Sequence, residues 1–303
     1  MMRSALLYLS EQKQLRHFTE TSPAARRLTS RFVAGFRLED AMQVAERLQR
    51  ERILSTLDRL GESVTSFNEA EGARDGYIEA VHEIAARKLP ATVSIKLTQF
   101  GLKLSEEGCR ENVLTLVRAA AAAGQMVEID MESSDLVDPT LAILVTAHEA
   151  CGNVRGVIQA YLRRSEKDIE MLCVRGIPVR LCKGAYKEPE SVAFAKKSEV
   201  DAMYVHLMKV LLDKGPQPAI ATHDDRIIAE AKRYVRERGI TADQFEFQML
   251  YGIRRDLERR FAAEGWRLRL YVPYGDAWYP YFMRRLAERP ANVLFLARNF
   301  FRG

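Results

Sequence analysis

Four residues near the C-terminal end of the chain could bind a small anion together. Tyr281, Arg284, Arg285 and Glu288 recur at i, i+3, i+4 and i+7, so one helix face would carry a phenol, two guanidinium groups and a carboxylate. Paired guanidinium groups hold a carboxylate through several charge-assisted hydrogen bonds, which suits an amino acid or a small organic acid. A solvated charged surface is the alternative interpretation of the same pattern.

A second group of polar residues stands at the ends of short apolar runs. Strands of a parallel barrel end at one face, so these side chains would gather at a single site. The group consists of Lys96, Asp130, Gln159, Arg180, Lys183, Thr222, His223, Gln248, Tyr271 and Tyr274.

Two kinds of chemistry follow from particular members of this group. Glu128, Asp130 and Glu132 would share one face of a strand and offer hard oxygen ligands to a metal ion. Salt-bridged strand ends are the commoner explanation of such carboxylates, and we predict no metal site. Lys96 or Lys183 could form a Schiff base with a carbonyl substrate if burial or a neighbouring cation depressed the pKa of its amine.

A third possibility is an anionic cofactor such as a flavin, held by the scattered basic groups. Arg284 and Arg285 would then hold the substrate. The residue pattern alone does not choose among the metal, the Schiff base and the flavin.

The elements that would position these residues alternate regularly from residue 53 onward. Runs rich in Val, Ile and Leu are separated by stretches with helical periodicity, which predicts an α/β fold of the (β/α)8 barrel type. A doubly wound sheet is the alternative, but the sequence has no G-x-G-x-x-G loop. A ninth apolar run, at 293–301, is one more than the eight strands that such a barrel contains. The expected strands are 53–58, 93–97, 126–131, 154–162, 177–183, 218–223, 245–250 and 268–272.

Composition narrows the classes of protein further. The 303 residues carry 47% apolar side chains and a formal charge of +5, so the chain can bury a large core under a mixed surface. Its arginine doublets are scattered, and we predict no nucleic-acid partner. The four cysteines and five histidines show no zinc-binding spacing, and no apolar run of 18 residues is present. We therefore expect a cytoplasmic protein, with any membrane contact peripheral.

Four motifs in the same order resemble those of the proline dehydrogenase family. They are RLCKGAY at 180–186, ATHD at 221–224, FEFQMLYG at 245–252, and the stretch from YVPYG to RRLAER at 271–289. The similarity extends through most of residues 50–300, and FVAG at 32–35 resembles the N-terminal arm of monofunctional bacterial members. No aldehyde dehydrogenase domain follows, so the resemblance implies the single-activity enzyme.

The resemblance also carries expectations about the fold. It implies a distorted (βα)8 TIM barrel that binds FAD at its C-terminal face, with the last helix lying over the strand ends. We accordingly expect a helical arm at 1–52 and the FAD-binding barrel at 53–303. Residues 276–289 would form the overlying helix, and 293–301 would be a tail outside the barrel.

The implied reaction is the oxidation of L-proline to Δ1-pyrroline-5-carboxylate by hydride transfer to FAD, the first step of proline degradation to glutamate. By resemblance, Arg284, Arg285 and Lys96 hold the substrate carboxylate. Asp130 pairs with Lys96 and shapes the pocket. The substrate ring would be enclosed by Tyr271 and Tyr281, with apolar contact from Leu250.

For the flavin, the resemblance places Arg180 beside the isoalloxazine, where its charge would favour the reduced, anionic form. Ala195 and Asp224 depart from a threonine and an asparagine expected in relatives, which leaves the adenine end open. Electrons would pass to a quinone, which residues 2–17 could approach by weak interfacial attachment. The other implied flavin contacts are Met131, Gln159, Lys183, Gly184, Ala185, Lys197, Thr222, His223 and Gln248.

Overall fold

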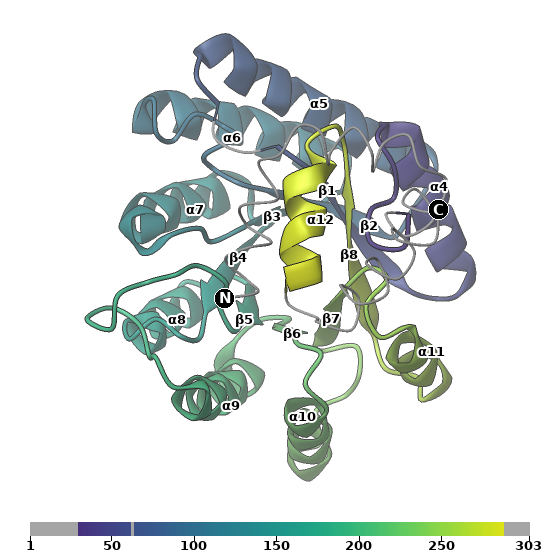
Figure 1. The fold of residues 1–303 in the computed structure, drawn as a ribbon, viewed down its shortest axis with the longest axis vertical. Coiled ribbons are helices and arrows are strands. Elements are labelled where there is room, and N and C mark those ends of the chain that lie inside the picture. Colours follow the sequence, from purple (N-terminus) through teal and green to yellow (C-terminus); the bar gives the residue numbers. More distant parts are fainter. Residues whose placement is uncertain (1–29, 62–63, 288–303) are drawn as a thin grey trace, which may run out of the picture.

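The computed structural model describes residues 30–61 and 64–287, apart from the side chains at 280 and 284–287. Within this part of the chain, eight parallel strands close into a barrel in sequence order, as predicted, with β8 paired to β1 (Figure 1). The strands are β1 (Leu54–Arg59), β2 (Ala91–Ile95), β3 (Val127–Ile129), β4 (Val154–Gln159), β5 (Val179–Cys182), β6 (Ala219–Ala221), β7 (Glu246–Leu250) and β8 (Leu268–Tyr274). Each overlaps the run that predicted it. The apolar run at 293–301, and residues 2–17 of the expected helical arm, lie outside the described residues.

The helices between the strands surround the barrel. Ser66 caps α5 by accepting a hydrogen bond from the Glu69 amide, and Ser105 caps α6 in the same way through Gly108. Gly152 and Gly239 end α7 and α10 with left-handed backbone, which glycine adopts without steric cost. The outer helices are α5 (Phe67–Ala86), α6 (Glu106–Ala122), α7 (Val137–Cys151), α8 (Ser165–Val174), α9 (Lys197–Lys214), α10 (Asp225–Arg238) and α11 (Arg255–Ala263), with a 3₁₀ turn η1 (Ser134–Leu136) before α7.

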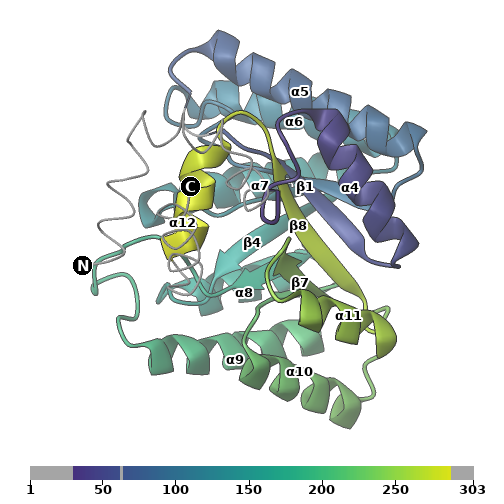
Figure 2. The same ribbon diagram turned by 45° about the vertical axis from the view of Figure 1, so that its right-hand side comes forward.

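The last described helix, α12 (Trp278–Ala287), does not pack beside β8. It lies across the centre of the barrel in Figure 1 and over one end of it in Figure 2. Since α12 directly follows β8, that end is the one where the strands finish. The expectation that the final helix covers the C-terminal face is confirmed.

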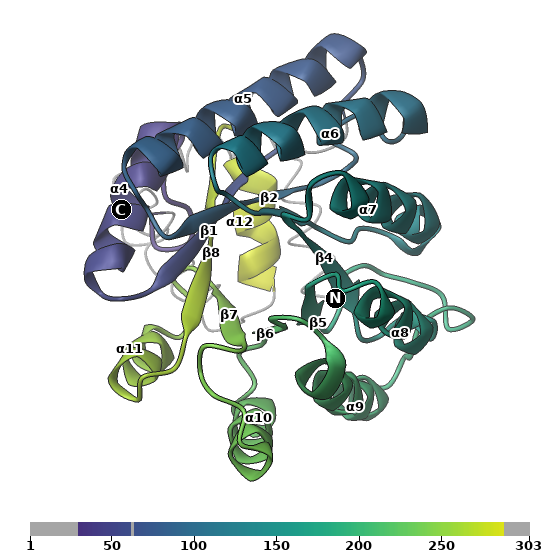
Figure 3. The same ribbon diagram turned by 180° about the vertical axis from the view of Figure 1, so that it is seen from behind.

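The place beside β8 and β1 is taken by α4 (Leu38–Arg50), which comes before the first strand (Figure 3). Its apolar face, with Met42 and Leu48 among its buried side chains, belongs to the same hydrophobic cluster as Leu57 of β1 and Val272 of β8. The predicted boundary between an arm at 1–52 and a barrel at 53–303 stays a prediction. Residues 38–50 nevertheless contribute to the barrel's own core.

We expect Met42→Ala to destabilise the whole barrel. Met42 is fully buried between α4 and the strands, and loss of such a side chain typically costs about 2–5 kcal/mol. Urea unfolding followed by circular dichroism should show one transition moved to lower urea. Gln43→Ala, on the exposed side of the same helix, should change stability by less than about 0.5 kcal/mol. A separate early transition, with the main one unmoved, would instead mean that α4 folds as an independent arm.

Candidate active site

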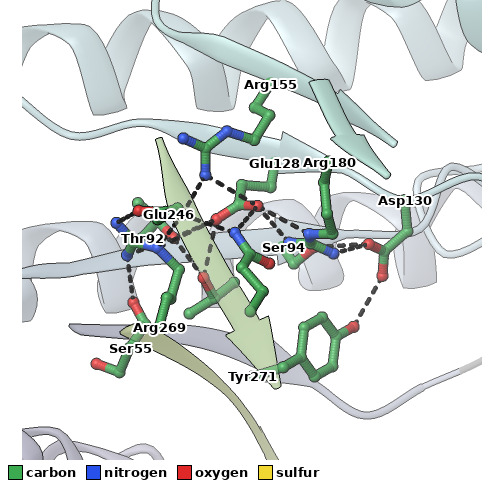
Figure 4. A network of polar contacts seen from close by, with 12 residues as sticks. Ser55, Thr92, Ser94, Glu128, Asp130, Arg155, Arg180, Glu246, Arg269 and Tyr271 are labelled. Carbon is green, nitrogen blue, oxygen red and sulfur yellow. Dashed lines mark hydrogen bonds and ion pairs between the residues drawn. The ribbon is translucent and has the colours of Figure 1, made fainter. Parts of the chain in front are cut away.

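The interior of the barrel is polar and charged. At alternate positions the strands point hydroxyl, amide, carboxylate and guanidinium groups toward the axis, whereas barrels of this type are usually filled by branched apolar side chains. Figure 4 shows the resulting network. The buried side chains are Thr56 of β1, Thr92 and Ser94 of β2, Glu128 of β3, Arg155 of β4, Arg180 of β5, Glu246 and Gln248 of β7, and Arg269 of β8, which also donates to the backbone carbonyl of Ser55.

Glu128 lies at the centre of this network. Its carboxylate accepts hydrogen bonds of 2.8 Å from the hydroxyls of Thr56 and Thr92, and one of 3.0 Å from Nε of Arg180. A second nitrogen of Arg180 also contacts it. Burial opposes ionisation, but the surrounding arginines outweigh burial and hold the pKa of Glu128 well below its usual range. Glu128 is therefore a fixed anion beneath Arg180.

Glu246 balances the other two buried arginines. Nη1 of Arg155 lies 2.6 Å from its carboxylate and Nε of Arg269 lies 2.8 Å from it. Burial again opposes ionisation, yet Arg269 and Arg155 lower the pKa of Glu246 to about 2. Gln248, which we predicted to contact a flavin, lies between the two carboxylates and donates to Glu246 at 2.8 Å and to Glu128 at 3.3 Å.

The mouth of the barrel, where the strands end, brings together four residues that the sequence assigned to the substrate or the chemistry. Nζ of Lys96 lies 3.3 Å from the Asp130 carboxylate and 3.2 Å from the Tyr271 hydroxyl, and this hydroxyl donates to Asp130 at 2.8 Å. Nη1 of Arg180 lies 2.7 Å from the same carboxylate. Although burial opposes it, Lys96 and Arg180 lower the pKa of Asp130. Asp130 is thus an anion shared by two cations.

Lys96 is also paired with a residue that sequence reasoning missed. Oδ1 of Asp58 lies 3.1 Å from its ammonium group. Burial disfavours the charge on Lys96, but Asp58 and Asp130 outweigh burial and raise its pKa above the ordinary value. Lys96 is therefore an ammonium ion and not a free amine.

The helix over the mouth is held by an apolar cluster of its own. Tyr281, predicted to enclose the substrate ring, is 7% exposed and belongs to this cluster, and Leu250 packs against it. Arg284 and Arg285 lie on α12, but their side chains are outside the described part. The cluster comprises Phe32, Val33, Leu60, Ile253, Trp278, Tyr279, Tyr281, Phe282 and Met283.

The predicted flavin contacts at the ends of β3, β4 and β6 are all at this face. Met131 is buried, and the Gln159 amide donates to the backbone carbonyl of Glu132 at 2.8 Å. The Thr222 hydroxyl accepts from the Asp224 amide. Nε2 of His223 accepts from the Leu250 amide at 3.0 Å, which fixes the ring and leaves Nδ1 as the nitrogen that carries hydrogen in the neutral form.

Two lysines lie together beyond the ends of β5 and β6. Nζ of Lys183 is 2.5 Å from Asp201 and 2.9 Å from Asp224, and Nζ of Lys197 also contacts Asp201. Ala185 is exposed in the same loop. Gly184, which lies between Lys183 and Ala185, has φ +109°. A Cβ there would lie 2.2 Å from the Tyr161 ring, so this position requires glycine. The Tyr161 ring and the left-handed backbone at Gly184 therefore fix the path of this loop.

The carboxylates considered for a metal ion are engaged elsewhere. Glu128 and Asp130 pair with arginine and lysine, while Glu132 accepts from the amide and hydroxyl of Thr98. Within residues 30–61 and 64–287, no three His, Cys, Asp or Glu side chains form a group that could hold a metal.

Several residues of the network escaped sequence analysis. Glu246 and Arg269 lie between apolar neighbours inside predicted strands, Arg155 follows Val154 inside another, and Asp58 ends the expected strand 53–58. The signal was present in the period-two pattern, because a strand side chain in a barrel of this type faces either the apolar layer beneath the helices or the axis, and a charged side chain suits only the axis. What the sequence lacked was the partner, since Arg155 and Glu246 are 91 residues apart.

Comparison with known proteins gives a consistent result. A family model described as proline dehydrogenase matches residues 41–298. Proline dehydrogenase 1 of Bacillus subtilis (strain 168) is 42% identical over 298 residues, which cover 98% of this chain and 98% of that protein. The proline dehydrogenase of Deinococcus radiodurans is 39% identical and covers 99% of this chain and 98% of its own.

Solved structures agree with the fold. The crystal structure of proline utilization A from Bdellovibrio bacteriovorus, inactivated by N-propargylglycine, superposes with a TM-score of 0.81 at 27% identity. The match covers 86% of this chain and 32% of that one. The similarity therefore concerns one part of a much longer protein.

The low pKa of Glu246 predicts how stability depends on pH. A carboxylate whose folded pKa is depressed to about 2 stabilises the fold above its unfolded pKa of about 4.3, and this contribution disappears as the pH falls toward 2. Glu246→Gln should cost about 3–5 kcal/mol at pH 7, since it leaves Arg155 and Arg269 without their anion. In urea unfolding, the difference from wild type should shrink steadily between pH 4.5 and the lowest pH at which wild type stays folded.

The exposed Glu79 provides the control, because Glu79→Gln should leave stability nearly unchanged throughout that range. A difference between Glu246→Gln and wild type that is constant with pH would contradict the assignment of Glu246 as a buried anion.

Proposed function

The chain belongs to the proline dehydrogenase family and oxidises proline, and we propose that it transfers a hydride from L-proline to FAD and passes the electrons to a quinone. The product would be Δ1-pyrroline-5-carboxylate. The observation that carries this proposal is the pair of permanent cations, Lys96 and Arg180, held by Asp130 at the strand ends beneath α12.

Lys96 is placed to bind the substrate carboxylate. Its side chain is 21% exposed, and Asp58, Asp130 and the Tyr271 hydroxyl hold its ammonium group in place. Arg284 and Arg285 lie on α12 above the mouth, and we assign them the other contacts with the substrate carboxylate. We assign ring contacts to Tyr271, Tyr281 and Leu250. Positioning of this kind supplies much of the rate in a reaction that needs little covalent help.

Arg180 has a different role, because it is held deeper and more firmly. Glu128 contacts it from below and Asp130 from the side, so its guanidinium group is fixed before any ligand binds. A fixed cation beside a bound isoalloxazine favours negative charge on that ring system and costs no reorganisation during the reaction. When bound, FAD supplies the hydride acceptor.

The residues present fit such a cofactor. Lys183 and Lys197 form a pair of cations near the first turns of α9 and α10, where backbone amides also favour an anionic diphosphate. We assign Gly184 to the cofactor through its backbone, since the Tyr161 ring fills the side where its side chain would be. We assign the remaining contacts to Met131, Gln159, Ala185, Thr222 and His223. Gln248 would act mainly through Glu128, to which its amide is bound.

The resemblance to the family implies a quinone as the electron acceptor. Among the described helices, none is long and apolar enough to span a membrane. We propose that the protein is cytoplasmic and reaches a quinone by peripheral contact at the inner face of the membrane.

A Schiff-base lyase is the competing function, and the structure gives an argument against it. Attack on a carbonyl needs an unprotonated amine, so a catalytic lysine of this kind has a depressed pKa. Asp58 and Asp130 outweigh burial and shift the pKa of Lys96 in the opposite direction. Lys183 is bonded to two carboxylates, Asp201 and Asp224.

Purified protein should be yellow, and its visible absorbance should bleach when L-proline is added without oxygen. Bleaching would follow from transfer of two electrons to the flavin, and a soluble quinone should restore the colour. D-proline serves as the control. A colourless protein that does not take up FAD, and that borohydride traps covalently with a carbonyl substrate, would replace this proposal with the lyase.

Arg180→Lys should slow reduction of the flavin much more than it weakens proline binding. Lysine keeps the charge but cannot reproduce the contacts of the guanidinium fork with Glu128 and Asp130. Losing a preorganised donor of this kind typically slows the chemical step by about 10²–10³. Anaerobic stopped-flow mixing over a range of proline concentrations separates the two constants, and the proline Kd should change less than about threefold.

Arg175→Lys is the matched control, because Arg175 pairs with Glu149 on the outer surface. It should leave both constants unchanged. An Arg180→Lys variant with a wild-type reduction rate and a much larger proline Kd would place Arg180 at the substrate and not at the flavin.

A further inference from the structure

We infer that Asp58 is a positioning residue, which holds the ammonium group of Lys96 where the substrate carboxylate binds. The inference rests on the proposed function, because it takes Lys96 to be a substrate-binding residue. Asp58 lies deeper than Lys96, with 2% of its side chain exposed against 21%, so it acts through Lys96.

The order of the strands explains how Lys96 is held. Lys96 directly follows β2, which lies between β1 and β3 in the barrel. Asp58 comes from β1 and Asp130 directly follows β3, so carboxylates from both neighbouring strands face the same ammonium group. Nζ lies 3.1 Å from Asp58 and 3.3 Å from Asp130. The two anions hold the lysine between them.

The three contacts of the ammonium group are not equivalent. An ammonium has three N–H donors, and here they have Asp58, Asp130 and the Tyr271 hydroxyl as partners. The last two form one unit, because the hydroxyl donates to Asp130 at 2.8 Å. Asp58 is the partner that opposes this unit. Without it, both remaining contacts would draw Nζ toward Asp130 and away from the position it has here.

Asp58 is itself fixed by its surroundings. The residue as a whole is buried, and the hydroxyl of the fully buried Tyr77 on α5 lies 3.4 Å from its carboxylate. A buried carboxylate is costly without a cation, which makes Lys96 necessary to Asp58 as well. The two residues should therefore be energetically coupled both in stability and in substrate binding.

A double-mutant cycle with Asp58→Asn and Lys96→Met tests the inference. Asp58→Asn should raise the KM for proline about tenfold and change kcat less than about threefold, because the displaced ammonium group binds the carboxylate less well. In the Lys96→Met background, the same substitution should change KM less than about twofold. The ratio of flavin to protein absorbance should be equal in all four proteins.

Stability gives a second readout of the same cycle. Asp58→Asn should lower the urea midpoint of the wild-type protein, since Lys96 loses an anion. With Met at position 96, it should raise the midpoint, because it removes repulsion between Asp58 and Asp130. Asp168→Asn is the matched control: Asp168 is a buried carboxylate paired with Arg164 at 2.8 Å on the outer helix α8, so its loss should reduce stability without changing KM.

Each outcome of the cycle has one meaning. An Asp58→Asn variant with an unchanged KM overturns the inference, and so does a lower KM, because Asp58 would then compete with the substrate. An equal rise in KM in both backgrounds also overturns it. If Lys96→Met itself leaves KM unchanged, the assignment of Lys96 to the substrate carboxylate fails first. Should Asp58→Asn not fold, Asp58→Glu moves the charge by one methylene, and an unchanged KM in that variant would likewise overturn the inference.

Discussion

The ion pair between Glu128 and Arg180 is the contact on which the rest of the site depends. It joins β3 to β5 past the intervening β4 inside the barrel, where both side chains are buried. Buried charges are tolerated only when they are paired and hydrogen-bonded. The interior meets this condition with four cations and four anions in contact: Lys96, Arg155, Arg180 and Arg269 against Asp58, Glu128, Asp130 and Glu246.

This balance has a consequence for stability as well as for chemistry. A charged interior cannot supply the apolar core that fills most barrels, so the core lies between the strands and the outer helices. In return, the cations at the mouth are rigid. Arg180 is held by two anions from β3 and its end, and Lys96 by anions from β1 and the end of β3, which fixes both groups before a ligand arrives. Preorganisation of this kind is what electrostatic stabilisation of a transferred charge requires.

Sequence reasoning found the fold and the mouth but not the interior. The barrel follows from eight apolar runs that alternate with helical periodicity, a signal that is local and repeated. Lys96, Asp130 and Arg180 stood out because they end strands. Glu246 did not, because alternation in a strand does not say which set of side chains faces the axis. Asp58 ends the expected strand 53–58 and carried the same signal as Lys96, but the sequence identified no partner for it. Their partners come from strands far apart in sequence, and only closure of the barrel brings them together.

The position of α12 also ties the site to residues outside the barrel's strands. Because the last described helix covers the mouth, the place beside β8 and β1 is left to α4. The segment just before α4 then passes near the mouth, where Phe32 and Val33 pack into the same cluster as Trp278 and Phe282 of α12. The described chain before the first strand therefore covers the outside of β1 and β8 and also supports the helix that carries Arg284 and Arg285. Positioning of the proposed carboxylate clamp depends on contacts made more than two hundred residues earlier in the sequence.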